Sequence, residues 1–319
     1  MSQLATVSDP LDTLRAEARD VLESQNISKR IAAREAGVAE STFSLWLSAK
    51  YTGDNQKVAE AVEKWLESRA ARERALRTAP TEPGFQLTPT AREILAALEF
   101  AQTAPDICVV SGGAGIGKTT AIMEYQRTHP NVWIATMEPS TSSVHGVLTE
   151  LCDVMRVGEL SAAKLSRAIG AKARGTGGLI IVDEAQHLST AALEQLRAFP
   201  DKYAVGLALI GNEEVYARIE GGGRKPKFAQ LFSRIGMRMT RSNPQAQDIH
   251  MLIDAWGVKA KEEEKLLKLI ARKPSALRGM TKCLKLATLI ASGQGVERTD
   301  EHIRMAWARL SPEDFKTAG

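Results

Sequence analysis

The fold is indicated most clearly by one stretch of sequence, Ile107-Cys-Val-Val-Ser-Gly112-Gly-Ala-Gly-Ile-Gly117-Lys118-Thr119. Its part from Gly112 to Thr119 matches the pattern G-x-x-x-x-G-K-[ST] in full. The context adds specificity, because the apolar run Ile107–Val110 predicts a buried strand and Thr119–Thr128 predicts a helix. In such a loop the backbone N–H groups and the helix N-terminus surround a phosphate group. We therefore expect a P-loop for a nucleoside triphosphate, with a glycine-rich turn that holds no ligand as the alternative.

Two side chains of this loop have separate expected roles. Lys118 would contact the β- and γ-phosphates, and the Thr119 hydroxyl would hold Mg²⁺. The expected ligands are ATP and Mg²⁺. The predicted nucleotide-binding residues of the loop are Gly112, Gly113, Ala114, Gly115, Ile116, Gly117, Lys118, Thr119 and Thr120.

A second apolar run, Leu179–Val182, ends in the acidic pair Asp183-Glu184. Apolar residues without alternation indicate a strand buried on both faces, as in a parallel sheet. Beside a P-loop, Asp183 would bind the magnesium ion through water, and Glu184 would orient and deprotonate the attacking water. A solvated acidic turn is the alternative.

A third apolar run, Ala204–Ile210, is followed by Gly211-Asn212. The Asn212 side chain could hydrogen-bond the attacking water or the γ-phosphate. Asparagine after glycine is also ordinary turn chemistry. The position of Asn212 after the acidic strand favours the catalytic reading.

The 319 residues divide into four regions by pattern. We expect an all-α helix-turn-helix domain at 1–68, a Pro- and Gly-containing linker at 69–89, an α/β core at 90–242 and a helical C-terminal unit at 243–319. A hydrophobic content of 44% and a charged content of 25% are ordinary for a soluble globular protein. The strand candidates are Ile107–Ser111, Val132–Ala135, Gly178–Asp183, Ala204–Ile210 and Gly236–Thr240.

The segment from Lys29 to Trp46 fits a helix-turn-helix. Ala33 is small where two helices cross, and Gly37 permits the turn between them. We expect a flanking helix over Asn55–Ser68 to complete a small core. A helical interaction module without DNA contact is the alternative. The side chains expected to face DNA are Ser41, Thr42, Ser44 and Lys50.

The net charge of +4 is small, but basic residues are concentrated in two segments. The segment from Ser161 to Gly177 contains four basic residues and no acid, and the spacing places most of them on one helix face. We expect these residues to contact DNA phosphates with little regard to sequence, or else to serve solubility alone. The candidate phosphate contacts are Lys164, Arg167, Lys172 and Arg174, with Arg224 and Lys225 in a second, glycine-rich loop.

Other function classes are disfavoured. Three widely spaced cysteines (Cys108, Cys152 and Cys283) argue against a zinc site or a disulfide framework. The longest apolar runs are too short to span a bilayer, and Met1–Asp20 contains no apolar signal segment. We expect a cytoplasmic protein without a membrane partner.

The order of these motifs resembles that of AAA+ ATPases over residues 90–310. The resemblance implies a five-stranded parallel sheet with a helical lid, and ATP bound between neighbouring subunits. It implies that Arg234, with Arg238 as a fallback, reaches the active site of the next subunit, where it would stabilise charge on the γ-phosphate. It further implies that Arg278 of the lid contacts the nucleotide of its own chain. Ordinary surface or DNA-facing charges are the alternatives.

Nearly the whole chain resembles one group within AAA+, the Mu B-type target-DNA activators of phage transposition. The residues that carry the resemblance include Asp183-Glu-Ala-Gln-His187, Leu231-Phe-Ser-Arg234 and Tyr51-Thr-Gly-Asp-Asn55. The resemblance implies ATP-dependent helical filaments on double-stranded DNA, activation of a transposase partner and, for a phage gene, the host cytoplasm. Gln186 departs from the aspartate expected there, which bears on the hydrolysis rate. The alternatives are a helicase loader and a helix-turn-helix repressor with a vestigial P-loop.

Overall fold

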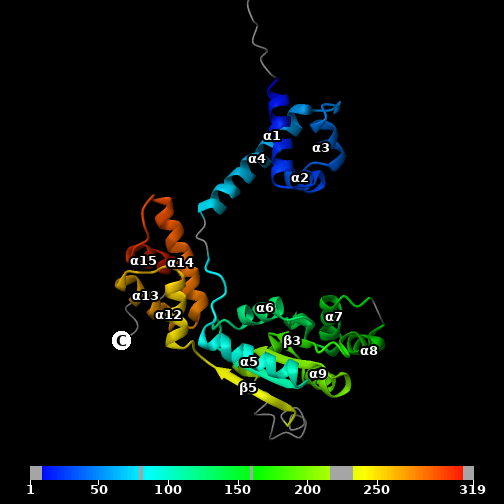
Figure 1. Cartoon of the computed structure of the whole chain (residues 1–319). Coiled ribbons are helices and arrows are strands. Elements are labelled where there is room, and N and C mark those ends of the chain that lie inside the picture. Colours follow the sequence, from blue (N-terminus) through cyan, green and yellow to red (C-terminus); the bar gives the residue numbers. More distant parts are fainter. Residues whose placement is uncertain (1–8, 79–81, 159–160, 216–232, 312–319) are drawn as a thin grey trace, which may run out of the picture. The chain divides into compact units, whose positions relative to one another are not determined.

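The computed structural model describes residues 9–78, 82–158, 161–215 and 233–311 (Figure 1). The chain divides into two compact units, Met1–Ala79 and Pro80–Gly319. No helix among the described residues has the length and apolar character needed to cross a membrane.

The first unit consists of four helices: α1 (Pro10–Ser24), α2 (Lys29–Ala36), α3 (Glu40–Leu47) and α4 (Asn55–Thr78). The Ser28 side chain caps α2, and Gly37 ends it with a left-handed φ of 71°. The core contains the fully buried Phe43, Trp46 and Val62. The expected end of the last helix at Ser68, and with it the start of the linker at residue 69, was wrong. Helix-forming Ala, Arg, Glu and Leu residues continue α4 to Thr78.

The second unit contains a five-stranded parallel sheet, which confirms the predicted α/β fold class. Its strands are β1 (Ile107–Gly112), β2 (Val132–Thr136), β3 (Leu179–Asp183), β4 (Gly206–Gly211) and β5 (Ile235–Arg241), in the spatial order β2-β3-β4-β1-β5. All five strands were expected to within two residues at each end. Because the strands are parallel, β1, β3 and β4 end at the same edge of the sheet.

Helices cover both faces of the sheet (Figure 1). On one face α7 (Val144–Met155), α8 (Ala162–Ala173) and α9 (Thr190–Tyr203) pack against side chains such as Val109. On the other face α5 (Pro89–Thr103) and α6 (Lys118–Thr128) pack against side chains such as Val110. Both faces of β1, β3 and β4 are therefore buried, which explains their continuous apolar sequences.

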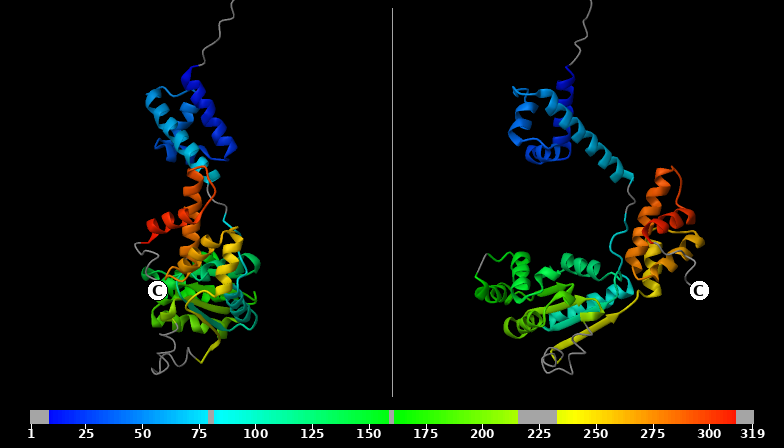
Figure 2. Two further views of the ribbon diagram at one scale, coloured as in Figure 1. Left: turned by 90° about the vertical axis from the view of Figure 1, so that its left-hand side faces the viewer. Right: turned by 180° about the vertical axis from the view of Figure 1, so that it is seen from behind.

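The C-terminal helices form a lid with a core of its own. They are α12 (Ala246–Ala255), α13 (Lys261–Ala271), α14 (Ala276–Gly293) and α15 (Asp300–Leu310). Figure 2 shows them gathered beyond the end of the sheet toward which β5 points. Asp248 of α12 is fully buried and accepts hydrogen bonds from Thr90 N (2.9 Å) and Thr90 Oγ1 (2.5 Å) at the start of α5. These contacts join the lid to the sheet domain.

Candidate nucleotide site

The P-loop lies between the end of β1 and the start of α6, as the sequence predicted. Gly115 and Gly117 have φ angles of 78° and 100°, in the region that favours glycine. A Cβ at Gly115 would clash with the Ser275 carbonyl. The backbone of the lid therefore packs directly against the backbone of the loop at this point. The Lys118 Nζ atom donates to the Gly112 and Gly113 carbonyls, each at 2.8 Å. The side chain of Lys118 is therefore held inside the loop, at the N-terminus of α6.

The Lys118 ammonium is partly buried. Burial is the main cause that lowers its pKa, and the nearby Glu184 and Asp183 oppose this effect. A partly desolvated cation at a helix N-terminus attracts an anion more strongly than an exposed one. The loop thus places a partly desolvated cation beside the N-terminus of α6, where a phosphate group can bind.

Thr119 and Asp183 meet across the sheet edge. Thr119 Oγ1 donates to Asp183 Oδ2 at 3.0 Å, and the Glu184 backbone N–H donates to Asp183 Oδ1 at 2.9 Å. Asp183 is only 2% exposed, and burial raises the pKa of its carboxyl. A hydroxyl and a carboxylate this close together are oxygen ligands of the kind that Mg²⁺ takes alongside substrate phosphates and water. Both residues fit the metal role predicted for them.

The two remaining catalytic candidates lie at the ends of β3 and β4. Glu184 follows β3 with a left-handed φ of 54°. Asn212 follows β4, which pairs with both β1 and β3 in the sheet. The side chain of Gln186 contacts both positions, since it donates to Glu184 Oε2 and accepts from Asn212 N at 3.2 Å. The sheet therefore brings Asp183, Glu184 and Asn212 to the edge that carries Lys118.

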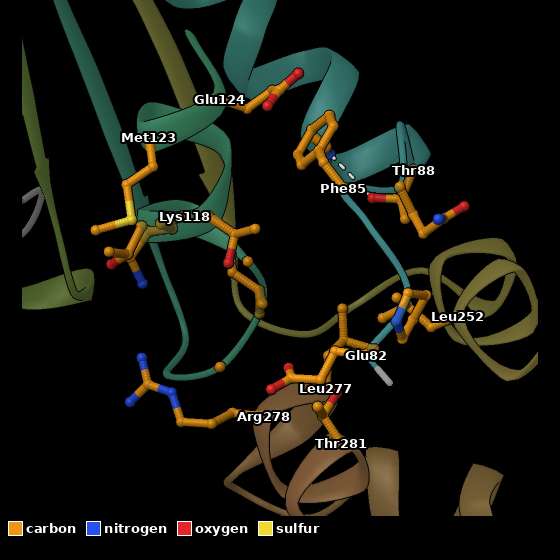
Figure 3. A pocket seen from close by; sticks show the side chains of 18 of the residues that line it. Glu82, Phe85, Thr88, Lys118, Met123, Glu124, Leu252, Leu277, Arg278 and Thr281 are labelled. Carbon is orange, nitrogen blue, oxygen red and sulfur yellow. Dashed lines mark hydrogen bonds between the residues drawn. The ribbon is translucent and has the colours of Figure 1, made fainter. Parts of the chain in front are cut away.

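A cleft of about 720 Å³ opens above this edge (Figure 3). The P-loop, Glu184, Gln186 and Asn212 line one part of it. The lid lines another part with Leu252, Trp256 and Leu277, and with Arg278, which Figure 3 shows beside the loop. Apolar walls beside a phosphate-binding loop suit the base of a nucleotide.

The connector 82–88 lines the same cleft, although its composition suggested only a linker. Phe85 packs against the core of the sheet domain, and Glu82 forms an ion pair with Lys285 of α14. The sequence did not reveal that this segment lines the cleft, because prolines and glycines indicate irregular structure without indicating what the segment contacts. Residues 82–88, which were expected only to link two domains, therefore also line the cleft.

The two arginines implied by the family resemblance differ in placement. Arg278 lines the cleft, and its backbone N–H donates to the Gly115 carbonyl at 3.3 Å. Arg234 precedes β5, at the end of the sheet opposite to the P-loop, and forms an ion pair with Asp201. Arg238 lies within β5 and is exposed. Neither Arg234 nor Arg238 lines the nucleotide cleft of its own chain.

The candidate DNA contacts lie on separate helices. Ser41 of α3 is exposed, whereas Thr42 and Ser44 are half-buried. Lys164, Arg167 and Lys172 are exposed on α8, and helical spacing places Arg167 opposite the buried Leu165 and Ile169. Arg174 was expected on the same helix face, but α8 ends at Ala173 and the Arg174 guanidinium turns toward α9, where it donates to the Lys202 carbonyl. Arg224 and Lys225 lie outside the described residues.

All three cysteines are buried, as small apolar side chains commonly are. Burial raises the pKa of the Cys108 thiol to about 12. The described residues contain no cluster of histidine, cysteine and acidic side chains that could hold a metal by itself.

The sheet order, the P-loop, the acidic strand and the lid define an ATPase of the AAA+ class. Family models match the chain in two parts: an AAA domain at residues 102–219 and the Mu B transposition protein, C terminal, at residues 233–310. The chain belongs to the Mu B family of transposition proteins. It is 37% identical over 302 residues to the ATP-dependent target DNA activator B of Escherichia phage Mu, covering 94% of this chain and 96% of that protein.

A second relative supports this assignment, and a solved structure is similar in fold. The Mu-like prophage FluMu DNA transposition protein B of Haemophilus influenzae is 36% identical over 273 residues, covering 84% of this chain and 94% of that protein. The fold is similar to that of Cdc6p from Pyrobaculum aerophilum, with a TM-score of 0.56 and 13% identity over 74% of this chain and 71% of that one. The second likeness concerns the fold alone.

Proposed function

We propose that this chain is an ATP-dependent activator that binds target DNA with little sequence preference, assembles on it as a filament and delivers it to a transposase. The observation that carries the proposal is the meeting of Lys118, Thr119, Asp183 and Glu184 at one sheet edge, in a chain that shares 37% identity with the phage Mu activator. In this proposal the first unit (Met1–Ala79) binds DNA, residues 90–242 form the ATPase core, residues 243–319 form the lid, and the protein acts in the host cytoplasm.

The proposed chemistry is transfer of the γ-phosphoryl group of ATP to water. Glu184 takes a proton from the water as its oxygen bonds to the γ-phosphorus and the bond to the β,γ-bridging oxygen breaks. Lys118 and the P-loop N–H groups stabilise the charge on the phosphate oxygens, and Asn212 orients the water or the γ-phosphate. Thr119 and Asp183 would hold Mg²⁺, which supplies additional positive charge to the phosphates.

Arg234 supports the proposed self-association. Its placement away from the cleft of its own chain leaves it available to the site of a neighbouring subunit, once its ion pair with Asp201 is exchanged for the γ-phosphate. Arg278 would contact the nucleotide from the lid of the same chain. In this arrangement ATP stabilises contacts between subunits, and hydrolysis weakens them.

Exposed basic residues support the proposed DNA contact. Lys164 and Arg167 form a cationic strip on α8, Lys172 is exposed on an adjacent face of the helix, and Arg224 and Lys225 are a second candidate pair in the sequence. Arg174 would contribute beyond the end of α8, once its guanidinium leaves the Lys202 carbonyl. Contacts to phosphate carry no sequence information, which fits target DNA of many sequences. In the first unit Ser41, Thr42 and Ser44 would face DNA, as in a helix-turn-helix.

Electron microscopy of the protein with linear duplex DNA and Mg²⁺ tests the proposal. We expect continuous filaments with ATP and none with ADP or without nucleotide. A single protected site in footprinting, equal with and without ATP, would instead identify a sequence-specific repressor.

The helicase-loader alternative is less well supported, because the relatives at 36–37% identity carry the names of a target DNA activator and a DNA transposition protein. Affinity capture with the neighbouring gene products distinguishes the two. Recovery of a transposase supports the activator, and recovery of a helicase supports the loader.

A further inference from the structure

The side-chain amide of Gln186 bridges the ends of two strands at the catalytic edge. Its Nε2 donates to Glu184 Oε2, after β3, and its Oε1 accepts from the backbone N–H of Asn212, after β4, at 3.2 Å. Gln186 is half-buried and lines the nucleotide cleft with both partners. One side chain therefore contacts both the proposed base and the strand end that carries the proposed water-orienting residue.

The chemistry of the partners fixes the orientation of this amide. A backbone N–H can only donate, so Asn212 N must face the amide oxygen. An ionised carboxylate can only accept, so Glu184 must face the amide NH₂ group. The two contacts require the same orientation, and reversing the amide would lose both.

The backbone makes room for the bridge. Glu184 adopts a left-handed φ of 54°, and the short helical turn η2 (Ala185–His187) brings Gln186 back toward β4. A Cβ at Gly211 would lie 2.5 Å from Gln186 Oε1, so only glycine there leaves space for the amide. Non-glycine residues with a left-handed backbone, such as Glu184, occur frequently at active sites.

We propose that Gln186 is the positioning residue for the catalytic carboxylate of Glu184, an inference that rests on the proposed hydrolysis by Glu184. The amide holds Oε2, so that Oε1 can serve as the proton acceptor for the attacking water. Because the same amide is bonded to the backbone of Asn212, a shift of the β4 end when the γ-phosphate binds or leaves also moves Glu184. Gln186 thus couples the state of the phosphate to the orientation of the base.

Steady-state ATP hydrolysis by two variants of the full chain tests this role. Gln186→Ala should lower kcat by about tenfold, as expected for loss of a group that orients a reacting one, with KM for ATP unchanged. Gln186→Glu keeps the size of the side chain and an acceptor for Asn212 N, but it loses the donor and places a negative charge beside Glu184. It should be at least as defective in kcat as the alanine variant.

A purely structural role predicts a different order. If Gln186 only fills space and anchors β4, the glutamate variant should hydrolyse ATP at nearly the wild-type rate, and that result would overturn the proposal. Gln195→Ala is a matched control, since Gln195 bonds Ser166 on α8, away from the cleft. It should leave kcat unchanged, and melting temperatures and ATP-analogue binding should show that all variants are folded and bind nucleotide.

A double variant separates this inference from the function beneath it. In a Glu184→Gln background, Gln186→Ala should cause no further loss of kcat, because the base that it positions is gone. A multiplicative further loss would contradict the coupling. Wild-type hydrolysis by Glu184→Gln alone would refute the base assignment itself, whereas loss in that variant with full activity in both Gln186 variants would refute only the positioning role.

Discussion

The backbone N–H of Arg278 donates to the Gly115 carbonyl at 3.3 Å, which joins lid helix α14 directly to the P-loop. Gly115 has a φ of 78°, and the Ser275 carbonyl occupies the space that a side chain would need. The lid is therefore attached to the phosphate-binding loop through main-chain atoms. A nucleotide that changes the loop is expected to move the lid as well.

Gly115→Ala tests this attachment. The substitution adds a Cβ that clashes with Ser275 and imposes a left-handed conformation that costs about 1–2 kcal/mol for a non-glycine residue. We expect affinity for a fluorescent ATP analogue to fall roughly tenfold. Gly293→Ala is the control, because Gly293 ends lid helix α14 and no atom lies within 4 Å of the new Cβ. This variant should bind the ATP analogue normally. Equal affinity in both variants would show that the lid contact does not affect the loop.

Glu184→Gln separates nucleotide binding from hydrolysis. The variant keeps the shape of the side chain and loses the proton acceptor, so we expect hydrolysis to fall by roughly 10²–10⁴-fold with ATP affinity retained. DNA-bound assemblies should then persist after free ATP is removed, which light scattering can follow. Disassembly at the wild-type rate would refute the role of Glu184 as base.

The basic strip of α8 is tested by salt dependence. Replacing Lys164 and Arg167 with Ala should weaken DNA binding equally across sequences, because phosphate contacts do not read bases. The slope of log K against log salt concentration should decrease by about one for each contact removed. An unchanged slope in equilibrium titrations would exclude this surface.

Glu35 is expected to stabilise the first unit in a pH-dependent manner. Its carboxylate accepts from Trp65 Nε1 at 3.0 Å and from Arg69 Nε at 2.9 Å. The Trp65 hydrogen bond is the main cause that lowers the pKa of Glu35 below its usual 4.5, with Arg69 second. Because the folded-state pKa is the lower one, the stabilisation is complete above pH 4.5 and is lost as the pH falls through the folded-state value.

Glu35→Gln should therefore lower the unfolding free energy of this unit by about 1 kcal/mol at neutral pH. Unfolding followed by tryptophan fluorescence should show the difference between variant and wild type shrinking at acid pH. A difference that is constant with pH would mean that the charge of Glu35 contributes nothing.

The parts of the site that depend on local sequence were predictable. Leu179–Val182 is apolar without alternation because β3 is buried on both faces, and this pattern placed Asp183 correctly at a strand end. Gly115 and Gly117 of the P-loop are required by backbone conformation, so they could be expected from the sequence before any contact was known.

The parts that depend on tertiary contacts were not predictable. Phe85, Leu252 and Leu277 come from three distant segments, and only the folded chain brings them to one cleft. Gln186 was noted as a departure from the family pattern, but its bridge to Asn212 depends on β4 lying beside β3. The turn of Arg174 away from the α8 strip follows from the end of that helix at Ala173.

We expect occupancy of the P-loop pocket to control binding to DNA. Fluorescence anisotropy of a labelled duplex of arbitrary sequence, titrated with protein and Mg²⁺ in the presence of ATP, ADP or no nucleotide, measures this control. ATP should strengthen binding by about 10- to 100-fold, and Lys118→Ala should abolish this gain. Equal DNA affinity with and without ATP, or a full ATP effect in the Lys118 variant, would contradict this expectation.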